Sequence, residues 1–356
     1  MSTEWVLDAV ASIDKVAQES AEQRQAILTK PAGSLGVLER LAIQFAGWQG
    51  TYKPQLDQVH ISIFAADHGV AEEGVSAFPQ VVTGEMVKNF VRGGAAISVL
   101  AQHHQAKLEI IDVGVKDFPE MVGVIRARAG NSSHNIVQEN AMSEAQLQWA
   151  LQAGKDAAER AKANNAQVFI GGEMGIANTT SATAIACELL NISDAAELTG
   201  AGTGLDQEGI KHKSTIIAAI LERYKKELPQ QGLAGDNQAL HVLRSVGGFE
   251  IAALVGAYMR SAQLGIPVLV DGFITTAAAL VAVKLNENIR SWMLFSHCSA
   301  ESGHAKILSA LDVKSLVDFD MRLGEASGAA TVVPLIRQAL ALHNNMATFA
   351  EAEVSK

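Results

Sequence analysis

The sequence predicts an α/β protein with a mostly parallel sheet and helices on both faces. Two observations support this: apolar runs of strand length alternate with longer segments of helical periodicity, and polar residues or glycine follow each run. Strands buried on both faces are almost continuously apolar, which favours parallel pairing. The expected strands are residues 60–65, 108–113, 167–170, 267–270 and 292–295, with a weaker sixth at 315–319.

Helices are expected between these strands, at residues 82–102, 144–163, 181–189, 248–265 and 275–284. The chain opens with a helical stripe, one apolar residue in four between Trp5 and Ala17, then a break at 30–36 and a helix from 37 to about 48. Residues 329–343 also form a helical pattern, with Pro334 in the first turns, where a missing N–H is tolerated. We expect residues 52–319 to form a large α/β domain, and residues 1–51 and 320–356 together to form a small helical domain.

Composition and charge argue against several classes of partner. Lys and Arg number 28 against 38 Asp and Glu, a net charge of -10, whereas nucleic acid and anionic membranes attract basic surfaces. The chain contains no run of about 18 apolar residues, so no membrane span is expected. The first 25 residues lack a signal-peptide pattern. Cys187 and Cys298 cannot build a disulfide framework, which favours the cytoplasm. No His, Cys or Asp cluster has ligand spacing, so no metal is expected.

Polar residues and glycine lie at the ends of the five main expected strands. They are Asp67-His68-Gly69, Asp112-Val113-Gly114, Gly171-Gly172-Glu173, Asp271-Gly272 and Ser296-His297. Such residues can simply terminate strands. In open α/β sheets, however, ligands bind beyond the carboxyl ends of the strands. Five such turns therefore predict a shared crevice at that edge.

The segment at residues 171–181 is the most informative. A strand leads into it, a helix leaves it, its glycines let backbone N–H groups approach a ligand, and all four residues at 178–181 are favourable N-caps. Free N–H groups at a helix N-terminus bind phosphate, although an ordinary capped loop fits the same residues. Glu173 has little structural reason to lie beside a phosphate site, so we expect it to contact a ribose or a developing positive charge.

A second glycine-rich loop spans residues 200–206. It lacks the last glycine of a dinucleotide fingerprint, because Leu205 occupies that position, and the chain has no Walker motif. Lys211 and Lys213 follow the loop, and a lysine there could supply a point charge to a phosphate. A solvated basic helix face is the alternative.

A single carboxylate, Glu325, lies among glycine and small residues at 320–330, which leave room for a flat ligand. Glutamate is a common general base, and partial burial raises its pKa toward neutrality. A glutamate favoured by the dipole at a helix start is the alternative.

The loop at residues 76–80 offers a flat apolar surface at Phe78 and Pro79. Ser76 and Gln80 add groups that form hydrogen bonds. The loop could therefore line a heteroaromatic pocket, or it could be an ordinary surface loop.

Taken in order, these segments resemble the nicotinate-nucleotide:dimethylbenzimidazole phosphoribosyltransferase family, whose members activate the lower ligand base of cobalamin. The resemblance runs along nearly the whole chain. Its motifs are KPAGSLG at 30–36, AADHGV at 65–70, FPQ at 78–80, GGAAI at 93–97, GEMGIANTT at 172–180, GTG at 202–204, VDGFI at 270–274, SAE at 299–301 and LGE at 323–325.

The resemblance implies a doubly wound parallel sheet, a small helical domain built from both chain ends, a homodimer, and neither a metal nor a bound cofactor. Glu325 matches the family's general base, and Glu173 is expected to act beside it. The matches to the base pocket are Ser76, Phe78, Gln80 and Leu323. The matches on the nucleotide side are Gly175, Ile176, Asn178, Thr179, Thr180, Gly202, Thr203, Gly204 and Lys213.

Four alanines depart from the family's pattern. The family often has Pro at Ala32, Gly at Ala177, Arg at Ala201 and Gly at Ala326. Ala177 adds a methyl group to the phosphate loop, and Ala326 adds one beside the base. Both carboxylates and the cap residues at 178–181 are intact, so we expect a slightly reshaped site rather than a lost one.

The implied reaction moves the 5-phosphoribosyl group of nicotinate mononucleotide to 5,6-dimethylbenzimidazole, giving α-ribazole phosphate and nicotinate. The partners would be small molecules only. With water as the nucleophile, the same site would be a nucleotide N-glycosidase. Without catalysis, the chain would be a nucleotide-binding regulatory module, although two carboxylates in glycine-rich loops argue against this because phosphate binding needs none.

Overall fold

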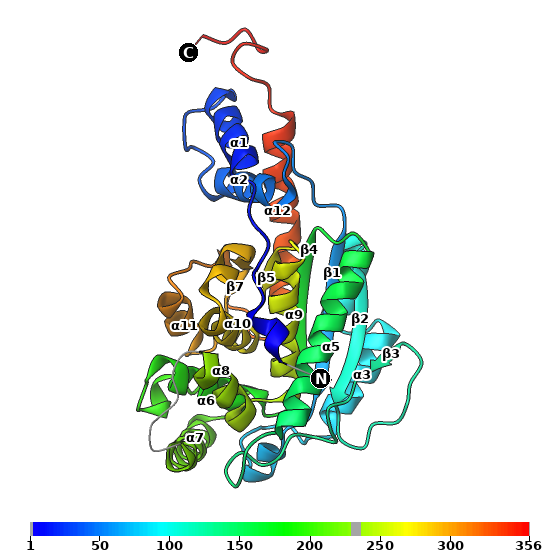
Figure 1. Ribbon diagram of the computed structural model, residues 1–356, viewed down its shortest axis with the longest axis vertical. Coiled ribbons are helices and arrows are strands. Elements are labelled where there is room, and N and C mark those ends of the chain that lie inside the picture. The colour runs from blue at the N-terminus through cyan, green and yellow to red at the C-terminus, as the bar shows by residue number, and fades with distance from the viewer. Residues whose placement is uncertain (1–2, 229–235, 356) are drawn as a thin grey trace.

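Six strands form one sheet in the order β3-β2-β1-β4-β5-β6, and every neighbouring pair is parallel. The computed structural model shown in Figure 1 describes residues 3–228 and 236–355. The order reverses between β1 and β4, so the sheet is doubly wound, which confirms the predicted fold class. The strands are β1 Val59–Ala66, β2 Lys107–Gly114, β3 Val124–Arg126, β4 Val168–Met174, β5 Val268–Val270 and β6 Met293–Phe295.

The five main predicted strands all lie in this sheet, but the sixth does not. Val317–Asp318 form β8, which pairs with β7 His297–Cys298 in a separate two-stranded sheet. The segment crosses just beyond β6, where the Val317 N–H donates to the Ser296 carbonyl oxygen. Strand β3 is not predicted, because this short edge strand is only partly buried and lacks a long apolar run.

Helices cover both faces of the sheet, as predicted (Figure 1). A Cβ on Gly171 would meet Leu254 of α9, whereas a Cβ on the next residue, Gly172, would meet Ala326 just before α12, so these two helices lie on opposite faces. Helix α5 packs on α9, and α3 and α4 pack on the α12 face. The helices are α3 Val82–Arg92, α4 Ala96–His104, α5 Glu144–Ala163, α6 Asn178–Leu190, α7 Gln207–Glu227, α8 Asp236–Val246, α9 Phe249–Gln263, α10 Phe273–Leu285, α11 His304–Ala310 and α12 Ser327–Asn345.

Three helical predictions need correction. The expected helix at 82–102 is two helices, because Gly93 ends α3 in a left-handed conformation with a φ of 83°. The stripe from Trp5 to Ala17 is interrupted: a short turn, η1 Glu4–Leu7, precedes an irregular segment, and α1 Lys15–Ile27 begins only where Asp14 caps it. Pro334 lies inside α12 rather than in its first turns, because the helix already begins at Ser327.

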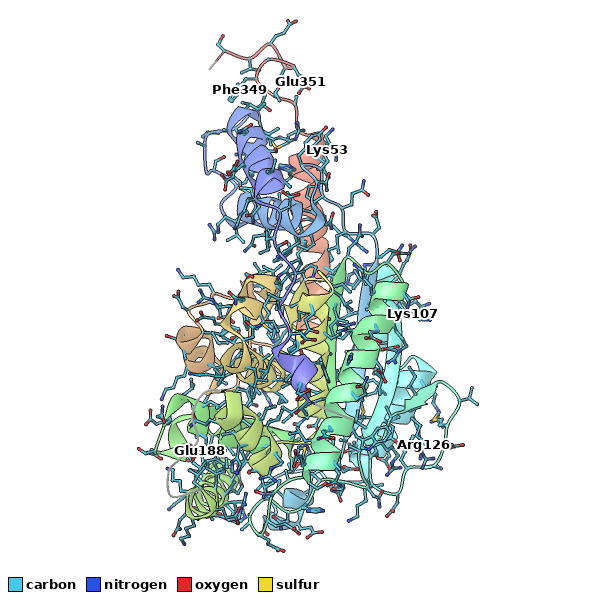
Figure 2. All side chains as sticks on the ribbon, in the orientation of Figure 1. Lys53, Lys107, Arg126, Glu188, Phe349 and Glu351 are labelled. Atoms are coloured by element: carbon cyan, nitrogen blue, oxygen red, sulfur yellow. The ribbon has the colours of Figure 1, made fainter. Side chains whose placement is uncertain are left out.

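The helical segment at residues 15–49 and the end of α12 lie together, away from the sheet, whereas residues 4–7 lie against α9 (Figure 1). Helix α2 Val37–Gln49 packs against both α1 and α12, and Leu28 forms a β-bridge with Thr348. Figure 2 shows Phe349 and Glu351 beyond this helical cluster. These contacts support a small helical domain, while its division from residues 52–319 stays a prediction. Residues 1, 2 and 356 of the predicted domain lie outside the described residues.

Candidate active site

A cavity of about 490 Å³ opens at the carboxyl ends of the strands, beside the point where the strand order reverses. Figure 2 labels Lys107, at the start of β2, and Arg126, at the end of β3, so the strands run toward the Arg126 end of the molecule. Open α/β sheets bind ligands at this edge, and the strand-end residues predict the same place. The predicted site residues that line the cavity are Ser76, Phe78, Glu173, Gly175, Ile176, Asn178, Thr179, Gly202, Thr203, Leu323 and Glu325.

Four other predicted residues are not in the cavity lining. Gln80 Nε2 donates to the His68 carbonyl oxygen at 2.9 Å, and Thr180 is fully buried in α6. Gly204 lies two residues beyond the lining residue Gly202 in the same loop. Lys213 is buried in α7. Their roles stay predictions.

The turn between β4 and α6 presents backbone N–H groups to the cavity. The N–H groups of Ile176, Asn178 and Thr180 already donate within the chain. In the described part of the chain, the N–H groups of Gly175, Ala177 and Thr179 find no acceptor. Free N–H groups in front of a helix, with the helix dipole behind them, form a site for an anion such as phosphate.

The cap of α6 differs from the prediction. Ala177 is the N-cap residue, with a left-handed φ of 76° and no capping side chain, so Asn178, Thr179 and Thr180 form the first helical turn. A left-handed conformation costs an alanine on the order of 1–2 kcal/mol. The turn therefore leaves N–H groups exposed, and the cost is backbone strain at Ala177.

Lys213 reaches this turn from behind. Its Nζ donates to Thr179 Oγ1 at 2.6 Å, and a Cβ on Gly202 would lie 3.0 Å from the same Nζ. Burial lowers the pKa of Lys213 to about 8, while the charge of Glu301 opposes this shift. A bound anion would favour the protonated lysine, so this group is matched to a phosphate.

Glu173 is buried at the end of β4 and accepts a hydrogen bond from Asn178 Nδ2, in the first turn of α6. Burial raises its pKa to about 8, and the negative charge of Glu250 adds to the shift. A cation in the cavity would reverse both effects by stabilising the carboxylate. Glu173 is therefore suited to contact a positively charged ligand group or one that becomes positive.

Glu325 stands on strained backbone. Gly324, Glu325 and Ala326 are all left-handed, with φ values of 82°, 62° and 66°. Such strain costs roughly 1–3 kcal/mol for each non-glycine residue and persists where the surrounding structure holds it, often at functional sites. The Oε2 atom of Glu325 is buried and has no hydrogen-bond partner among the described residues. Burial raises its pKa to about 7, which suits a general base.

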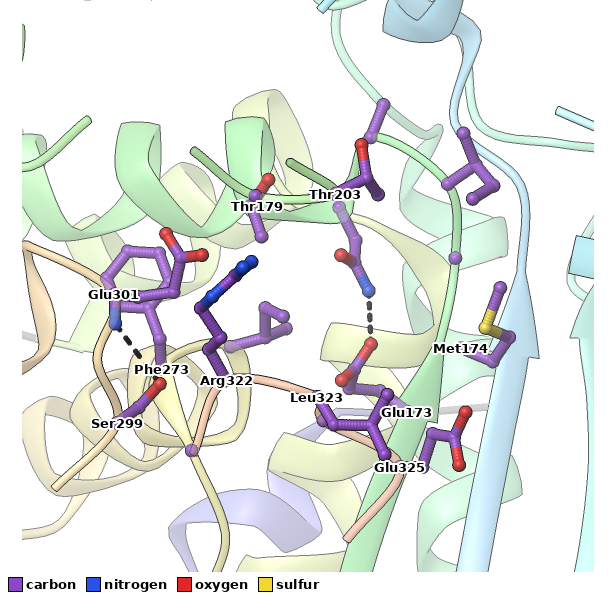
Figure 3. Close-up of a pocket in the computed structure, with 18 of the residues that line it drawn as sticks. Glu173, Met174, Thr179, Thr203, Phe273, Ser299, Glu301, Arg322, Leu323 and Glu325 are labelled. Atoms are coloured by element: carbon purple, nitrogen blue, oxygen red, sulfur yellow. Dashed lines mark hydrogen bonds between the residues drawn. The ribbon is translucent and has the colours of Figure 1, made fainter. Parts of the chain in front are cut away.

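The expected base side of the cavity is apolar and open. Phe78 and Leu323 line it and expose 53% and 59% of their surface, so their apolar faces are available to a flat ligand. Ser76 Oγ lies 2.9 Å from Thr203 Oγ1, which joins the loop at 76–80 to the loop at 200–206. Figure 3 shows Leu323 beside Glu173 and Glu325, with Thr203 above them.

Several polar residues of the cavity were not among the predicted site residues. Asp271 and His297 belong to the turns at the strand ends. The five turns together predict a crevice, but this pattern does not show which of their residues are functional. Glu301 belongs to the SAE motif, and Arg322 precedes the LGE motif. Figure 3 shows Glu301 and Arg322 across the pocket from Glu325. Val82 and Met86 also line the cavity and have no sequence signal, since their helix has an ordinary amphipathic pattern.

No group of three or more His, Cys, Asp or Glu side chains in residues 3–228 and 236–355 is arranged to hold a metal ion. Over the same ranges, no helix is both long enough and apolar enough to cross a membrane.

Comparison with known proteins decides the family. The model of the phosphoribosyltransferase family DBI_PRT matches residues 10–354. The chain belongs to this phosphoribosyltransferase family. It is 55% identical to the nicotinate-nucleotide–dimethylbenzimidazole phosphoribosyltransferase of Xanthomonas axonopodis pv. citri and 54% identical to that of Pseudomonas putida, in each case over 100% of this chain and 99% of the relative. A crystal structure of the Thermus thermophilus enzyme of the same name has a TM-score of 0.88 at 38% identity and covers 97% of this chain and 100% of its own.

For this phosphoribosyltransferase, the structure explains two departures from the family's pattern. Ala177 and Ala326, the positions at which the resemblance leads us to expect glycine, are both left-handed. Glycine adopts this conformation without steric cost. The two alanines therefore strain the backbone while leaving the loops in place.

Proposed function

We propose that this phosphoribosyltransferase transfers the 5-phosphoribosyl group of nicotinate mononucleotide to 5,6-dimethylbenzimidazole, forming α-ribazole phosphate for the nucleotide loop of cobalamin. The supporting observation is one cavity that combines an anion-binding turn with two buried carboxyls, Glu173 and Glu325, whose pKa values are raised to about 8 and about 7. A phosphate site needs neither carboxyl. The proposed reaction uses both: one carboxyl faces the carbon that becomes positive, and the other accepts the proton that the base loses.

The transfer step can be written with these groups. The ring nitrogen bonded to C1′ is a pyridinium, so it leaves with the electron pair as neutral pyridine and needs no acid. An unprotonated nitrogen of the benzimidazole supplies the electron pair for the new bond to C1′. The proton on its other nitrogen passes to Glu325, and Glu173 faces the positive charge that develops at C1′. Attack opposite the leaving group inverts C1′ to the α anomer.

Positioning is the main task of the nucleotide side. The free N–H groups of the turn at 175–179 and the Lys213 ammonium would hold the phosphate, which places C1′ beside Glu173 and facing the base. Holding two reactants in this way can lower a barrier by roughly 7–11 kcal/mol at best. The apolar faces of Phe78 and Leu323 would orient the flat base so that its N–H meets Glu325.

The test is to incubate the pure protein with nicotinate mononucleotide and dimethylbenzimidazole, following nicotinate release and identifying the product by mass and NMR. Formation of α-ribazole phosphate only when both substrates are present supports the proposal. Nicotinate release without the base would replace it with an N-glycosidase. Nucleotide binding without turnover would replace it with a binding module.

We further propose a cytoplasmic homodimer. Both cysteines, Cys187 and Cys298, are free thiols, which fits a reducing compartment. A groove of about 880 Å³ with mixed apolar and polar lining, formed by α2 residues such as Val37 and by β6, offers a face that a second copy could cover. Light scattering of the pure protein tests the dimer, and a monomeric mass over a wide concentration range contradicts it.

A further inference from the structure

His68 is a fully buried histidine directly behind the cavity. It follows β1, and its ring is held at both nitrogens: Nε2 lies 2.6 Å from Glu250 Oε1 in the first turn of α9, and Nδ1 lies 3.1 Å from Ser181 Oγ in the first turns of α6. Both partners are completely buried. Glycine at 248 makes room for the ring, since a Cβ there would overlap His68 Cε1.

The same residue touches both sides of the proposed site. The ring lies against the anion-binding turn, because a Cβ on Gly175 would be 3.3 Å from His68 Nε2. Its backbone carbonyl accepts from Gln80 Nε2, which anchors the loop at 76–80. One residue thus contacts the turn assigned to the phosphate and the loop assigned to the base.

A serine, a histidine and a glutamate in line also form the arrangement of a hydrolytic triad, and the geometry argues against that use. Ser181 is inside α6, fully buried and outside the lining of the cavity, so no substrate carbonyl can reach its Oγ. A buried ion pair is also weak evidence for a role in stability, because the cost of desolvation offsets much of the attraction. What the pair provides is orientation: Glu250 fixes the direction of the ring, and the ring fixes the turn.

We propose that His68 is a positioning residue of the transfer reaction, which sets the distance between the bound nucleotide and the base. The proposal rests on the proposed assignment of phosphate to the turn at 175–180 and of base to the loop at 76–80. Glu250 acts through His68 and is a positioning residue as well. Through its charge, it also raises the pKa of Glu173.

The test compares three variants. Ser181→Ala keeps the His68–Glu250 pair and removes only the contact of the ring with α6. His68→Gln retains an amide that can donate to Glu250 but loses the ring against Gly175. His60→Gln is the matched control: His60 is also buried on β1 and lies 3.4 Å from a buried carboxylate, Glu109, but it is near the amino end of the strand, away from the cavity.

Loss of one buried hydrogen bond that supports a binding site weakens the binding constant about 3- to 10-fold. We therefore expect Ser181→Ala to raise the KM for the nucleotide about 3- to 10-fold. His68→Gln should raise the KM values for both substrates and lower kcat by at least 10-fold. His60→Gln should lower only the melting temperature, with both KM values and kcat within twofold of the wild type.

The proposal is overturned if Ser181→Ala and His68→Gln behave like His60→Gln, with a lower melting temperature but unchanged kinetics. If His68→Gln does not fold, the nucleotide KM of Ser181→Ala decides alone. Wild-type turnover is measured first, because its absence would contradict the proposed function and not the role of His68. In that case calorimetric titration with nicotinate mononucleotide replaces the kinetics. Equal affinity of Ser181→Ala and wild type for the nucleotide would overturn the positioning role of His68.

Discussion

Two helices, α6 and α12, begin at the same cavity. Each is preceded by a left-handed residue, but they differ in whether the protein itself provides an acceptor for the first N–H groups. Helices α6 and α12 each follow a left-handed alanine, Ala177 or Ala326, and neither has a capping side chain. At α6, N–H groups of the turn remain free in the described structure. At α12, the Ala329 N–H donates to Asp271 Oδ1 at 2.7 Å, so the chain's own carboxylate occupies that helix start.

Under the proposed function, the free N–H groups at α6 would bind the phosphate, and the start of α12 would carry the general base Glu325. An unoccupied helix N-terminus attracts phosphate, whereas one already neutralised by Asp271 does not. Burial raises the pKa of Asp271 to about 7, although several backbone N–H groups oppose this shift. Glu325, two residues before α12 begins, lines the cavity, and its Oε2 has no hydrogen-bond partner among the described residues. The lesson is that a helix terminus becomes a ligand site only where the protein leaves it unoccupied.

The largest expected effect comes from removing the base at the α12 start. Glu325→Gln keeps the shape of the side chain and removes its proton-accepting charge, so kcat should fall about 10²- to 10⁴-fold with the fold intact. Steady-state kinetics and circular dichroism measure this. Asp320→Asn, an exposed carboxyl of the same segment, is the control and should retain activity. Near-normal turnover of Glu325→Gln would remove Glu325 from the base role.

The next effect concerns the charge behind the α6 start. Lys213→Met removes the ammonium that reaches Thr179, so the KM for nicotinate mononucleotide should rise roughly 10- to 100-fold while that for the base stays unchanged. Lys211→Met changes an exposed lysine of the same helix and should have little effect. An equal effect of both variants would mean that a diffuse positive field, rather than Lys213, attracts the nucleotide.

Asp271→Asn tests why α12 does not bind an anion. The amide would place a donor among backbone N–H donors, so the free energy of unfolding should fall by about 1–3 kcal/mol in urea denaturation. Asp312→Asn, at a carboxyl whose side chain is 95% exposed, is the control. Unchanged stability of Asp271→Asn would show that Asp271 does not neutralise this helix start.

The carboxyl beside the α6 start should make stability depend on pH. The pKa of Glu173 is raised from 4.5 to about 8, so the folded state holds a proton that the unfolded chain loses. Its contribution is complete below about pH 4.5 and is lost as the pH rises toward 8. The free energy of unfolding of the wild type, relative to Glu173→Gln, should therefore fall between pH 5 and 8. If this difference in the free energy of unfolding stays constant or rises between pH 5 and 8, the raised pKa of Glu173 is contradicted.

The smallest effect is the strain that both helix starts share. Ala177→Gly and Ala326→Gly should each raise the free energy of unfolding by up to about 1 kcal/mol, because glycine adopts the left-handed conformation freely. Ala341→Gly, at an exposed position inside α12, should lower it by roughly 0.5–1 kcal/mol. Destabilisation by all three changes would mean that the left-handed alanines are not strained.

Much of the fold could be predicted because burial leaves a local pattern. Continuous apolar runs locate β1, β2, β4, β5 and β6, since a strand covered on both faces has no polar side. The short edge strand β3 has no such pattern. Local signals also misplaced the start of α6: the residues at 178–181 favour caps, but the left-handed Ala177 begins the helix earlier.

For the site, local patterns in the sequence predict which segments contribute functional residues: glycine-rich turns after strands and the lone carboxylates Glu173 and Glu325 among small residues. How these segments meet depends on the tertiary structure. It placed Gln80 and Lys213 behind the lining, with the Lys213 ammonium on Thr179, brought Asp271 onto the start of α12, and set His68 between two loops. The physical reason is distance along the chain: glycine, caps and apolar runs act over a few residues, whereas the occupancy of a helix terminus and the burial that sets a pKa depend on residues far away in the sequence.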